Sequence, residues 1–176
     1  MDFLEFSEEK LYFDDPVSFE VEKLLKQASE AGTSDAAEAC LMRAYFLEPE
    51  HLTVLVALYR YLFYKHRYDE ALLVADRTLV ISGNRLGLSR SWNNMTASEL
   101  GHGVLVSMGL TRFYLFALKA SGYMYMRLGE MISALERLNK VADLDPADQF
   151  GCRELIEIAN TYLSERESDS KKMRQA

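Results

Sequence analysis

Cysteine, proline and long hydrophobic runs are scarce in this chain of 176 residues. The two cysteines, Cys40 and Cys152, belong to no CxxC pair. We therefore expect small buried thiols, and neither a disulfide framework nor a thiolate metal site. No run approaches the roughly 20 apolar residues that cross a bilayer, and the N-terminus is acidic where a secretion signal is basic. These absences predict a cytoplasmic protein without membrane association.

The motifs of common enzyme and cofactor sites are also missing. The histidines His51, His66 and His102 show no HExxH-like spacing that would place two metal ligands on one helix face. Residues 101–103, Gly-His-Gly, lack the lysine and the helix-start pattern of a phosphate-binding loop. We therefore expect a protein that is not an enzyme and that carries no cofactor and no metal.

A recurrent helical segment is the main feature of the chain. Three runs open with an alanine and close with a proline or glycine twelve residues later, and the first two alanines are 34 residues apart. The runs extend from Ala37 to Pro49, from Ala71 to Gly83 and from Ala134 to Pro146. Small residues let two helices approach closely, and larger apolar residues fill the space between neighbouring helix pairs.

This spacing resembles the tetratricopeptide repeat, a family of 34-residue helix pairs. Upstream of the last run, Gly122 and Tyr125 match the family's first-helix glycine and tyrosine, although no repeat carries its tryptophan. The resemblance implies an all-α fold, a tetratricopeptide-like right-handed solenoid of antiparallel helix pairs with a C-terminal capping helix. A helical bundle is the alternative, because it also shows alanine and leucine at helical spacing.

The resemblance and the local signals together predict a layout. We expect a single domain over residues 1–166 and a flexible tail over 167–176. Asp15 and Pro16 are the expected N-cap and first residue of a helix that ends at Gly32. The repeats cover 18–49, 52–83 and 115–146, an irregular insertion covers 84–111, and the capping helix covers 148–165. Further helices are expected over 35–48, 51–66, 69–82, 104–128 and 131–144, with a capping box at Thr96 and Glu99.

Charge is unevenly distributed along the chain, whose formal net charge is −7. Residues 1–50 hold 13 acidic and 4 basic residues for a net −9, and residues 128–176 hold 10 and 7 for a net −3. Residues 51–127 hold 4 acidic and 9 basic residues for a net +5. The basic middle favours an acidic protein partner, whereas the net negative charge disfavours nucleic acid.

The resemblance also implies where a partner binds. In tetratricopeptide repeats the first helix of each pair lines a concave groove, and in this register Arg60, Lys119 and Arg127 lie along it. Four aromatic residues lie among them, namely Phe63, Tyr64, Phe116 and Tyr123. Arginine and aromatic residues are enriched at binding hot spots. A solvated basic face, with tyrosines packed on the aliphatic stems of the cations, is the alternative.

Trp92 is the only tryptophan and falls in the segment that breaks the repeat. Ala71 and Ala134 are 63 residues apart, five short of two 34-residue periods, so this segment cannot be a regular repeat. One interpretation makes Trp92 a plug against the neighbouring repeat. The other makes it a contact for the partner, because loops on one face of a solenoid often bind ligands.

These observations predict a non-enzymatic scaffold or adaptor that binds an acidic, partly apolar peptide or partner surface in the concave groove. A second hypothesis is a self-assembling structural protein that uses its N-terminal arm, residues 1–15. The arm holds six acidic residues and several large apolar ones, so it needs a docking surface. It would be a cap on the first repeat, a lid on the groove, or a swapped element of a homodimer.

Three short blocks, RLGL, RFYLFALKA and RLGE, resemble small bacterial repeat proteins that accompany nitrogen-fixation genes. This resemblance implies a third hypothesis, an accessory factor in the assembly of a metalloenzyme such as nitrogenase. The three hypotheses share a role in protein assemblies and differ in the partner.

Overall fold

The chain forms an all-helical structure, as predicted. The computed structural model describes residues 16–88 and 91–175, without the side chains of residues 167 and 169–175. Secondary structure within these ranges is exclusively helical. The α-helices are α1 (Phe19–Ala31), α2 (Asp35–Leu47), α3 (Leu52–Tyr64), α4 (Tyr68–Leu86), α5 (Ala97–Val106), α6 (Met108–Leu128), α7 (Met131–Leu144) and α8 (Arg153–Gln175), and a 3₁₀ helix, η1, covers Trp92–Asn94.

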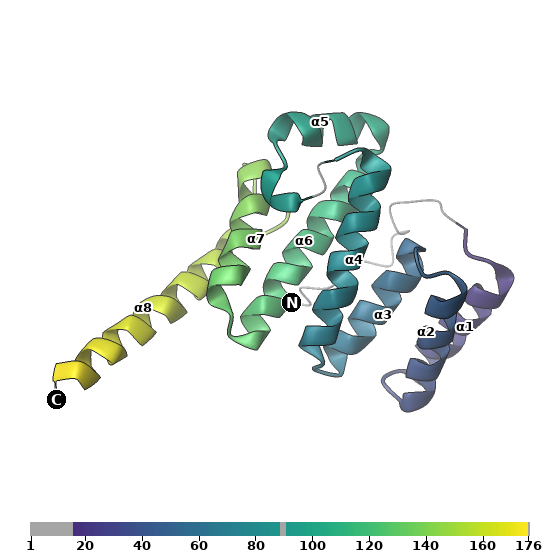
Figure 1. Ribbon diagram of the computed structural model, residues 1–176, viewed down its shortest axis with the longest axis horizontal. Coiled ribbons are helices and arrows are strands. Elements are labelled where there is room, and N and C mark those ends of the chain that lie inside the picture. The colour runs from purple at the N-terminus through teal and green to yellow at the C-terminus, as the bar shows by residue number, and fades with distance from the viewer. Residues whose placement is uncertain (1–15, 89–90, 176) are drawn as a thin grey trace.

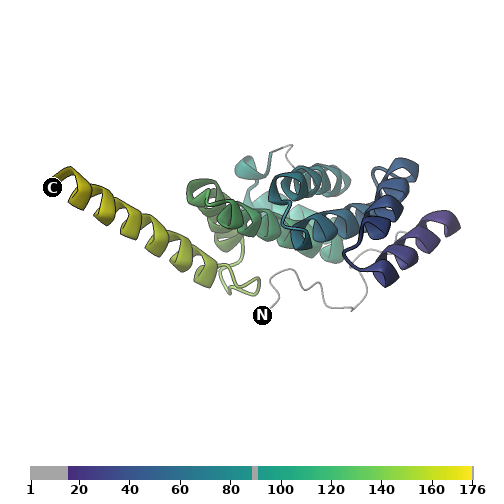
Figure 2. The same cartoon turned by 90° about the horizontal axis from the view of Figure 1, so that it is seen from below.

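Helices that follow one another in the chain pack side by side. The most extensive contacts join α4 to α6, followed by those of α6 with α7, α3 with α4 and α1 with α2. Figure 1 shows the succession from α1 to α8, with α5 lying across the ends of α4 and α6. Figures 1 and 2 both show α8 projecting away from the body. Among the described residues, no helix combines the length and apolarity needed to cross a membrane.

Small residues lie where paired helices meet. Ala37, Ala71 and Ala134 are all fully buried, as the repeat pattern predicts. At Gly122 of α6, an added Cβ atom would come within 2.9 Å of the Leu138 side chain and 3.4 Å of the Ala134 carbonyl oxygen. The distance between α6 and α7 therefore depends on residue 122 having no side chain.

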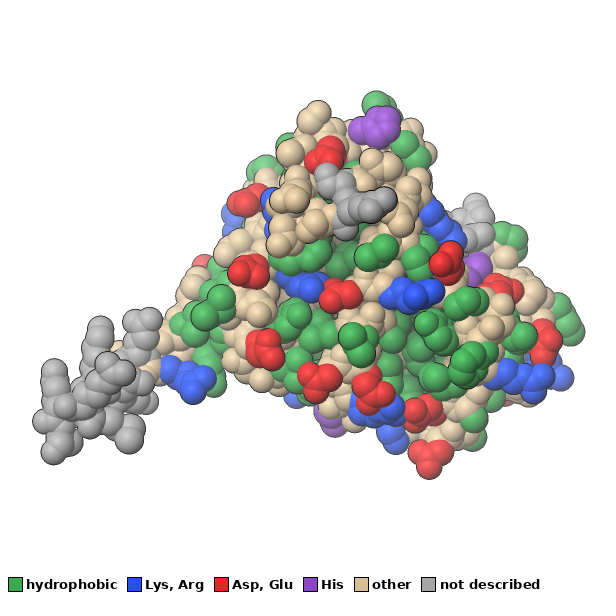
Figure 3. Space-filling model, viewed as in Figure 1, with side chains coloured by type: hydrophobic (Ala, Val, Ile, Leu, Met, Phe, Trp, Pro, Cys, Tyr) green, Lys and Arg blue, Asp and Glu red, His purple; other side chains and the backbone are tan. Residues whose placement is uncertain are grey.

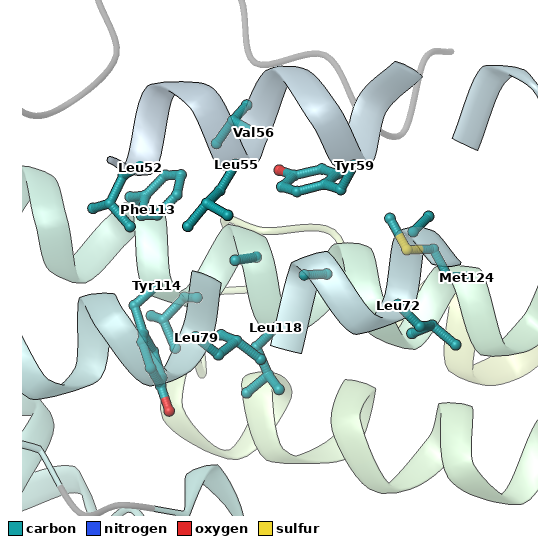
Figure 4. Close-up of a cluster of buried hydrophobic side chains, with 14 of the residues drawn as sticks. Leu52, Leu55, Val56, Tyr59, Leu72, Leu79, Phe113, Tyr114, Leu118 and Met124 are labelled. Carbon is teal, nitrogen blue, oxygen red and sulfur yellow. The ribbon is translucent and has the colours of Figure 1, made fainter. Parts of the chain in front are cut away.

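The main hydrophobic core lies between α3, α4 and α6. Tyr59, Phe113 and Leu118 are fully enclosed there, together with leucines from all three helices (Figure 4). Full burial of one such side chain contributes about 1.5–3 kcal/mol of transfer free energy. A smaller cluster joins α1, α2 and α3 through Val21, Leu24, Ala44 and Val54.

The first helix begins later than the sequence predicts. Pro16 lies outside the helix, so its expected place as the first helical residue is wrong, and Asp15, the expected N-cap, lies outside the described residues. Ser18 is the N-cap, because its Oγ accepts a hydrogen bond from the Val21 amide at 3.5 Å. The Ser18 amide donates to Glu48 Oε1 at 2.9 Å, which fixes the entry of the chain into α1.

The predicted helix end at Gly83 is also wrong. α4 continues to Leu86 and ends at Gly87, whose φ of 68° is in the left-handed region. Gly83 lies inside the helix, and an added Cβ atom there would meet the Tyr114 ring at 3.2 Å. This glycine therefore permits a close contact with α6 instead of ending a helix. Gly32, with a φ of 63°, ends α1 as predicted.

The segment 84–111 is largely helical. It contains the end of α4, η1, α5 and the start of α6, and Ser107 interrupts the predicted helix over 104–128. Ser107 is extended, and its Oγ accepts from the Leu110 amide at 3.2 Å, which caps α6. The predicted capping box is confirmed: the Glu99 amide donates to Thr96 Oγ1 at 3.2 Å and the Thr96 amide donates to Glu99 Oε2 at 2.9 Å.

The last helix starts and ends later than the predicted 148–165. Asp148 and Gly151 have positive φ angles of 52° and 63° and form the turn before α8. The backbone is helical through Gln175, so most of the predicted flexible tail continues α8. Cys152, just before α8, is buried as expected, whereas Cys40 is half-buried. Burial raises the pKa of the Cys152 thiol to about 12.

Replacing two helical glycines with alanine tests the contact between α6 and α7. We expect Gly122→Ala to lower the free energy of unfolding by about 1 kcal/mol or more, because overpacking costs about 1–3 kcal/mol and exceeds the gain in helix propensity. The control Gly101→Ala lies in open space in α5 and should raise this free energy by about 0.5–1 kcal/mol. Urea unfolding measures both. Stabilisation by both substitutions would contradict the described contact.

Candidate functional site

One aromatic and cationic cluster joins α3, α4 and α6. Phe63 lies at its centre, with ring centroids 5.7 Å from Tyr64, 5.3 Å from Tyr68 and 5.8 Å from Tyr123. These separations are typical of favourable edge-to-face and offset ring pairs. Arg127 completes the group through its contact with Tyr68. Hereafter the Phe63 cluster denotes Phe63, Tyr64, Tyr68, Tyr123 and Arg127.

Arg127, near the C-terminus of α6, is fixed by Tyr68. Its guanidinium carbon lies 5.4 Å from the centroid of the Tyr68 ring, and its Nε donates a hydrogen bond to the Tyr68 hydroxyl at 3.2 Å. The same hydroxyl contacts His66 Nδ1 at 2.7 Å. The hydrogen bond with Tyr68 raises the pKa of Arg127. The cluster therefore presents a permanent positive charge in a defined position.

The turn between α3 and α4 brings Tyr68 to the cluster. His66 adopts a left-handed φ of 58°, a conformation in which histidine is enriched among residues other than glycine. Arg67 holds the turn in place: Nη1 binds Glu38 Oε1 of α2 at 2.6 Å, and Nε binds Glu70 Oε1 of α4 at 2.6 Å. The hydrogen bond with Arg67 lowers the pKa of the Glu70 carboxyl. The ion pairs thus connect the cluster's turn to the preceding helix pair.

Three predicted groove residues lie apart from these contacts. Phe116 packs edge-on against Phe150 at 4.8 Å, and Lys119 Nζ donates to the Phe150 carbonyl oxygen at 2.5 Å. Phe150 belongs to the α7–α8 connection, which therefore covers this part of α6. Arg60 is half-buried on α3, where its charge partly offsets the rise in the pKa of Tyr59 that burial causes.

The structure thus separates the predicted groove into two parts. Phe63, Tyr64, Tyr123 and Arg127 come together, and Tyr68 joins them although sequence analysis did not select it. Tyr68 could have been identified from the sequence, because it is the first residue of α4, which directly follows the predicted groove helix α3. Nothing in the sequence indicated the contact between Lys119 and the α7–α8 connection, because this contact depends on how distant helices pack.

A second site, which sequence analysis missed, surrounds Arg137 of α7. Its guanidinium carbon lies 5.1 Å from the Trp92 ring centroid and 5.0 Å from that of Tyr125. Its Nη1 donates to Asp76 Oδ1 at 2.6 Å and to Ser121 Oγ at 2.8 Å, and its Nη2 donates to Asp76 Oδ2 at 3.2 Å. Arg137 is only 6% exposed, so these contacts compensate a cation that is almost removed from water.

Trp92 is half-buried at the start of η1, against Arg137 and the main core. This is the position expected if Trp92 packs as a plug against the neighbouring helices. The signal for Arg137 was present in the sequence, because it lies between Ala134 and Val141 on the face of α7 that packs inward. Its partner Asp76 lies 61 residues away in the chain and could not be identified from local spacing.

A cavity of about 260 Å³ lies beside Arg137, between α4, η1, α6 and α7. Its polar and aromatic lining comprises Asp76, Asn84, Ser91, Trp92, Tyr114 and Arg137. Among the side chains that the structure describes, no group of three histidine, cysteine, aspartate or glutamate residues is arranged to hold a metal ion. The polar and aromatic side chains of the lining can offer hydrogen bonds and ring stacking.

Comparison with known proteins gives one informative relative. No family model matches the chain, and no solved structure matches it. Over 165 residues the chain is 38% identical to the "Uncharacterized 19.8 kDa protein in nifW 5'region" of Azotobacter chroococcum mcd 1. The match covers 94% of this chain and 92% of that protein. The similarity therefore applies to nearly the full length of both.

A double-mutant cycle tests the Phe63 cluster. Phe63→Leu and Tyr123→Leu, made singly and together, should show a coupling free energy of about 0.5–1.5 kcal/mol, because paired rings attract each other beyond the effect of burial. The control pair of Phe63→Leu and Phe150→Leu should be additive to within about 0.5 kcal/mol, because Phe150 packs on Phe116. Urea unfolding supplies the free energies. Additivity in the first pair would contradict the ring contact.

Proposed function

The chain belongs to the same family as the uncharacterized Azotobacter chroococcum protein of the nifW 5'region, and we propose that it is a non-enzymatic scaffold or adaptor. The Phe63 cluster carries this proposal, because it combines aromatic rings with a fixed cation on one surface. The partner is an acidic, partly apolar peptide or protein surface. It binds at the cluster through ring contacts and an ion pair with Arg127.

A tetratricopeptide-like right-handed solenoid is the proposed architecture. Its repeats are the helix pairs α1–α2, α3–α4 and α6–α7, and α8 is the capping helix. The buried alanines Ala37, Ala71 and Ala134 support this assignment, because each lies in the second helix of a pair. In such a solenoid α3 and α6 line the concave surface, on which the Phe63 cluster then lies.

The arrangement of the cluster suits protein binding. Tyr64 is 41% exposed and Arg127 is exposed, while Phe63 and Tyr123 support them from half-buried positions. Because the side chains already hold one another, binding immobilises few new rotamers. Tyrosine and arginine also contribute disproportionately to the free energy of protein association. An acidic partner would therefore gain both charge pairing and ring burial.

The relative's printed name favours a more specific role. Its location in the nifW 5'region suggests that the scaffold is an accessory factor in the assembly of a metalloenzyme such as nitrogenase.

The alternative of self-assembly through the N-terminal arm depends on residues 1–15, which lie outside the described residues. If the arm forms a swapped dimer, the full chain should be a dimer and a chain that begins at Asp15 should be a monomer. Light scattering, which measures the molar mass, distinguishes the two.

Affinity capture with quantitative mass spectrometry tests the proposal. The tagged chain is incubated with an extract of a bacterium grown under nitrogen-fixing conditions, and a nitrogenase component or assembly protein is expected among the retained proteins. The double variant Tyr64→Ala/Arg127→Glu should retain about tenfold less of the specific partner, because it removes an exposed ring and reverses the cluster's charge.

Arg166→Glu is the matched control for this experiment. Arg166 lies over the Tyr162 ring of α8 at 5.7 Å, so the control reverses an arginine in the same kind of contact outside the cluster. It should retain the partner as the unaltered chain does. Equal retention by the cluster variant and the unaltered chain would rule out the Phe63 cluster as the binding surface.

A further inference from the structure

Arg137 has hydrogen-bonding capacity that its partners leave unused. A guanidinium carries five N–H groups. Two on Nη1 donate to Asp76 and Ser121, and one on Nη2 donates to Asp76. Nε donates no hydrogen bond to any other described residue. The Nε–H and the second Nη2–H lie on one edge of the planar group and form the fork that binds both oxygens of a carboxylate.

The cavity beside Arg137 adds further donors. The hydroxyls of Tyr114 and Ser91 and the amide of Asn84 line it, and their side chains make no hydrogen bond with another described residue. Figure 4 shows the Tyr114 hydroxyl pointing away from the apolar cluster that contains Leu79 and Leu118. Burial raises the pKa of Tyr114 to about 12, so this hydroxyl stays protonated and can donate. The cavity therefore offers several donors besides Arg137, although the same hydroxyls and the Asn84 amide can also accept.

The surroundings of the cavity are partly apolar. Leu79 and Val80 also line it, and Val80 is 53% exposed. In the view of Figure 1, Figure 3 shows hydrophobic side chains gathered over α2–α4, with charged side chains between them. The neighbourhood thus matches a ligand that presents a carboxylate together with apolar groups.

We propose that the cavity between α4, η1, α6 and α7 is a binding site for a carboxylate group, which the free edge of Arg137 and the Tyr114 hydroxyl hold. This inference goes beyond the scaffold function, because it assigns a second site away from the Phe63 cluster. Asp76 is the one acidic side chain of the lining, and its carboxylate already pairs with Arg137. A second carboxylate leaves the site with one net negative charge, which limits its affinity.

The single tryptophan gives a direct readout of this site. Because Trp92 lines the cavity and is the only tryptophan in the chain, its fluorescence reports occupancy. The probes are propionate, which represents a free small acid, and the capped peptide Gly-Glu-Gly, which represents an acidic side chain. Propionamide and capped Gly-Gln-Gly are the uncharged controls, and the ionic strength is held constant. Saturable changes are expected with the carboxylates only.

The two probes also distinguish the source of the carboxylate. Tighter binding of the peptide would indicate an acidic side chain of a partner protein, and equal or tighter binding of propionate would indicate a small acid. Either result supports the site. If neither carboxylate produces a saturable change, or if the amides match them, the proposal is wrong.

Two variants test the roles of the lining without removing the buried cation. Tyr114→Phe should weaken carboxylate binding about tenfold, because it removes a hydrogen bond to a charged group and keeps the ring. Asp76→Asn should tighten binding about tenfold, because it removes the competing negative charge. Tyr45→Phe, on α2, should leave the affinity unchanged. Weaker carboxylate binding by Asp76→Asn would overturn the proposal, because Asp76 would then assist the ligand instead of repelling it.

Discussion

The close approach of α6 to α7 at Gly122 is the constraint on which both candidate sites depend. A single added carbon there would come within 2.9 Å of the fully buried Leu138 side chain, so that the side chain or the helix would have to shift. α6 contributes Tyr123 and Arg127 to the Phe63 cluster, and Tyr114, Ser121 and Tyr125 to the surroundings of Arg137. Displacing this helix would therefore alter both surfaces at once.

Charge is used differently at the two sites. Arg127 is exposed and held over a ring, so its charge is available to a partner at little cost in desolvation. Arg137 is buried, and such a cation is tolerated only when hydrogen bonds and an anion surround it. Its contacts with Asp76, Ser121 and Trp92 connect α7 to α4, α6 and η1, so that η1 is fixed to the helices around it.

Local sequence signals located most of the helices, although not all of their ends, and did not reveal the contacts between them. The recurrence of an alanine twelve residues before a proline or glycine located the buried alanines, and the capping box at Thr96 was correct in detail. Gly83 was wrongly predicted to end a helix, because a glycine inside a helix looks the same in sequence as a glycine that ends one. Only the contact of Gly83 with Tyr114 shows which role this glycine has. The groove prediction grouped residues by register, whereas the covering of Lys119 by the α7–α8 connection depends on packing between distant segments.

Proton–proton contacts in a nuclear Overhauser spectrum test the central claim most directly. The α protons of Gly122 and Gly83 stand where a side chain would otherwise project, so each reports the helix that faces it. We expect cross-peaks from Gly122 to the Leu138 methyl groups and from Gly83 to the Tyr114 ring, since the corresponding Cβ positions lie 2.9 Å and 3.2 Å from these side chains. Absence of both cross-peaks in the assigned spectrum of the folded protein would contradict the helix packing from which both sites follow.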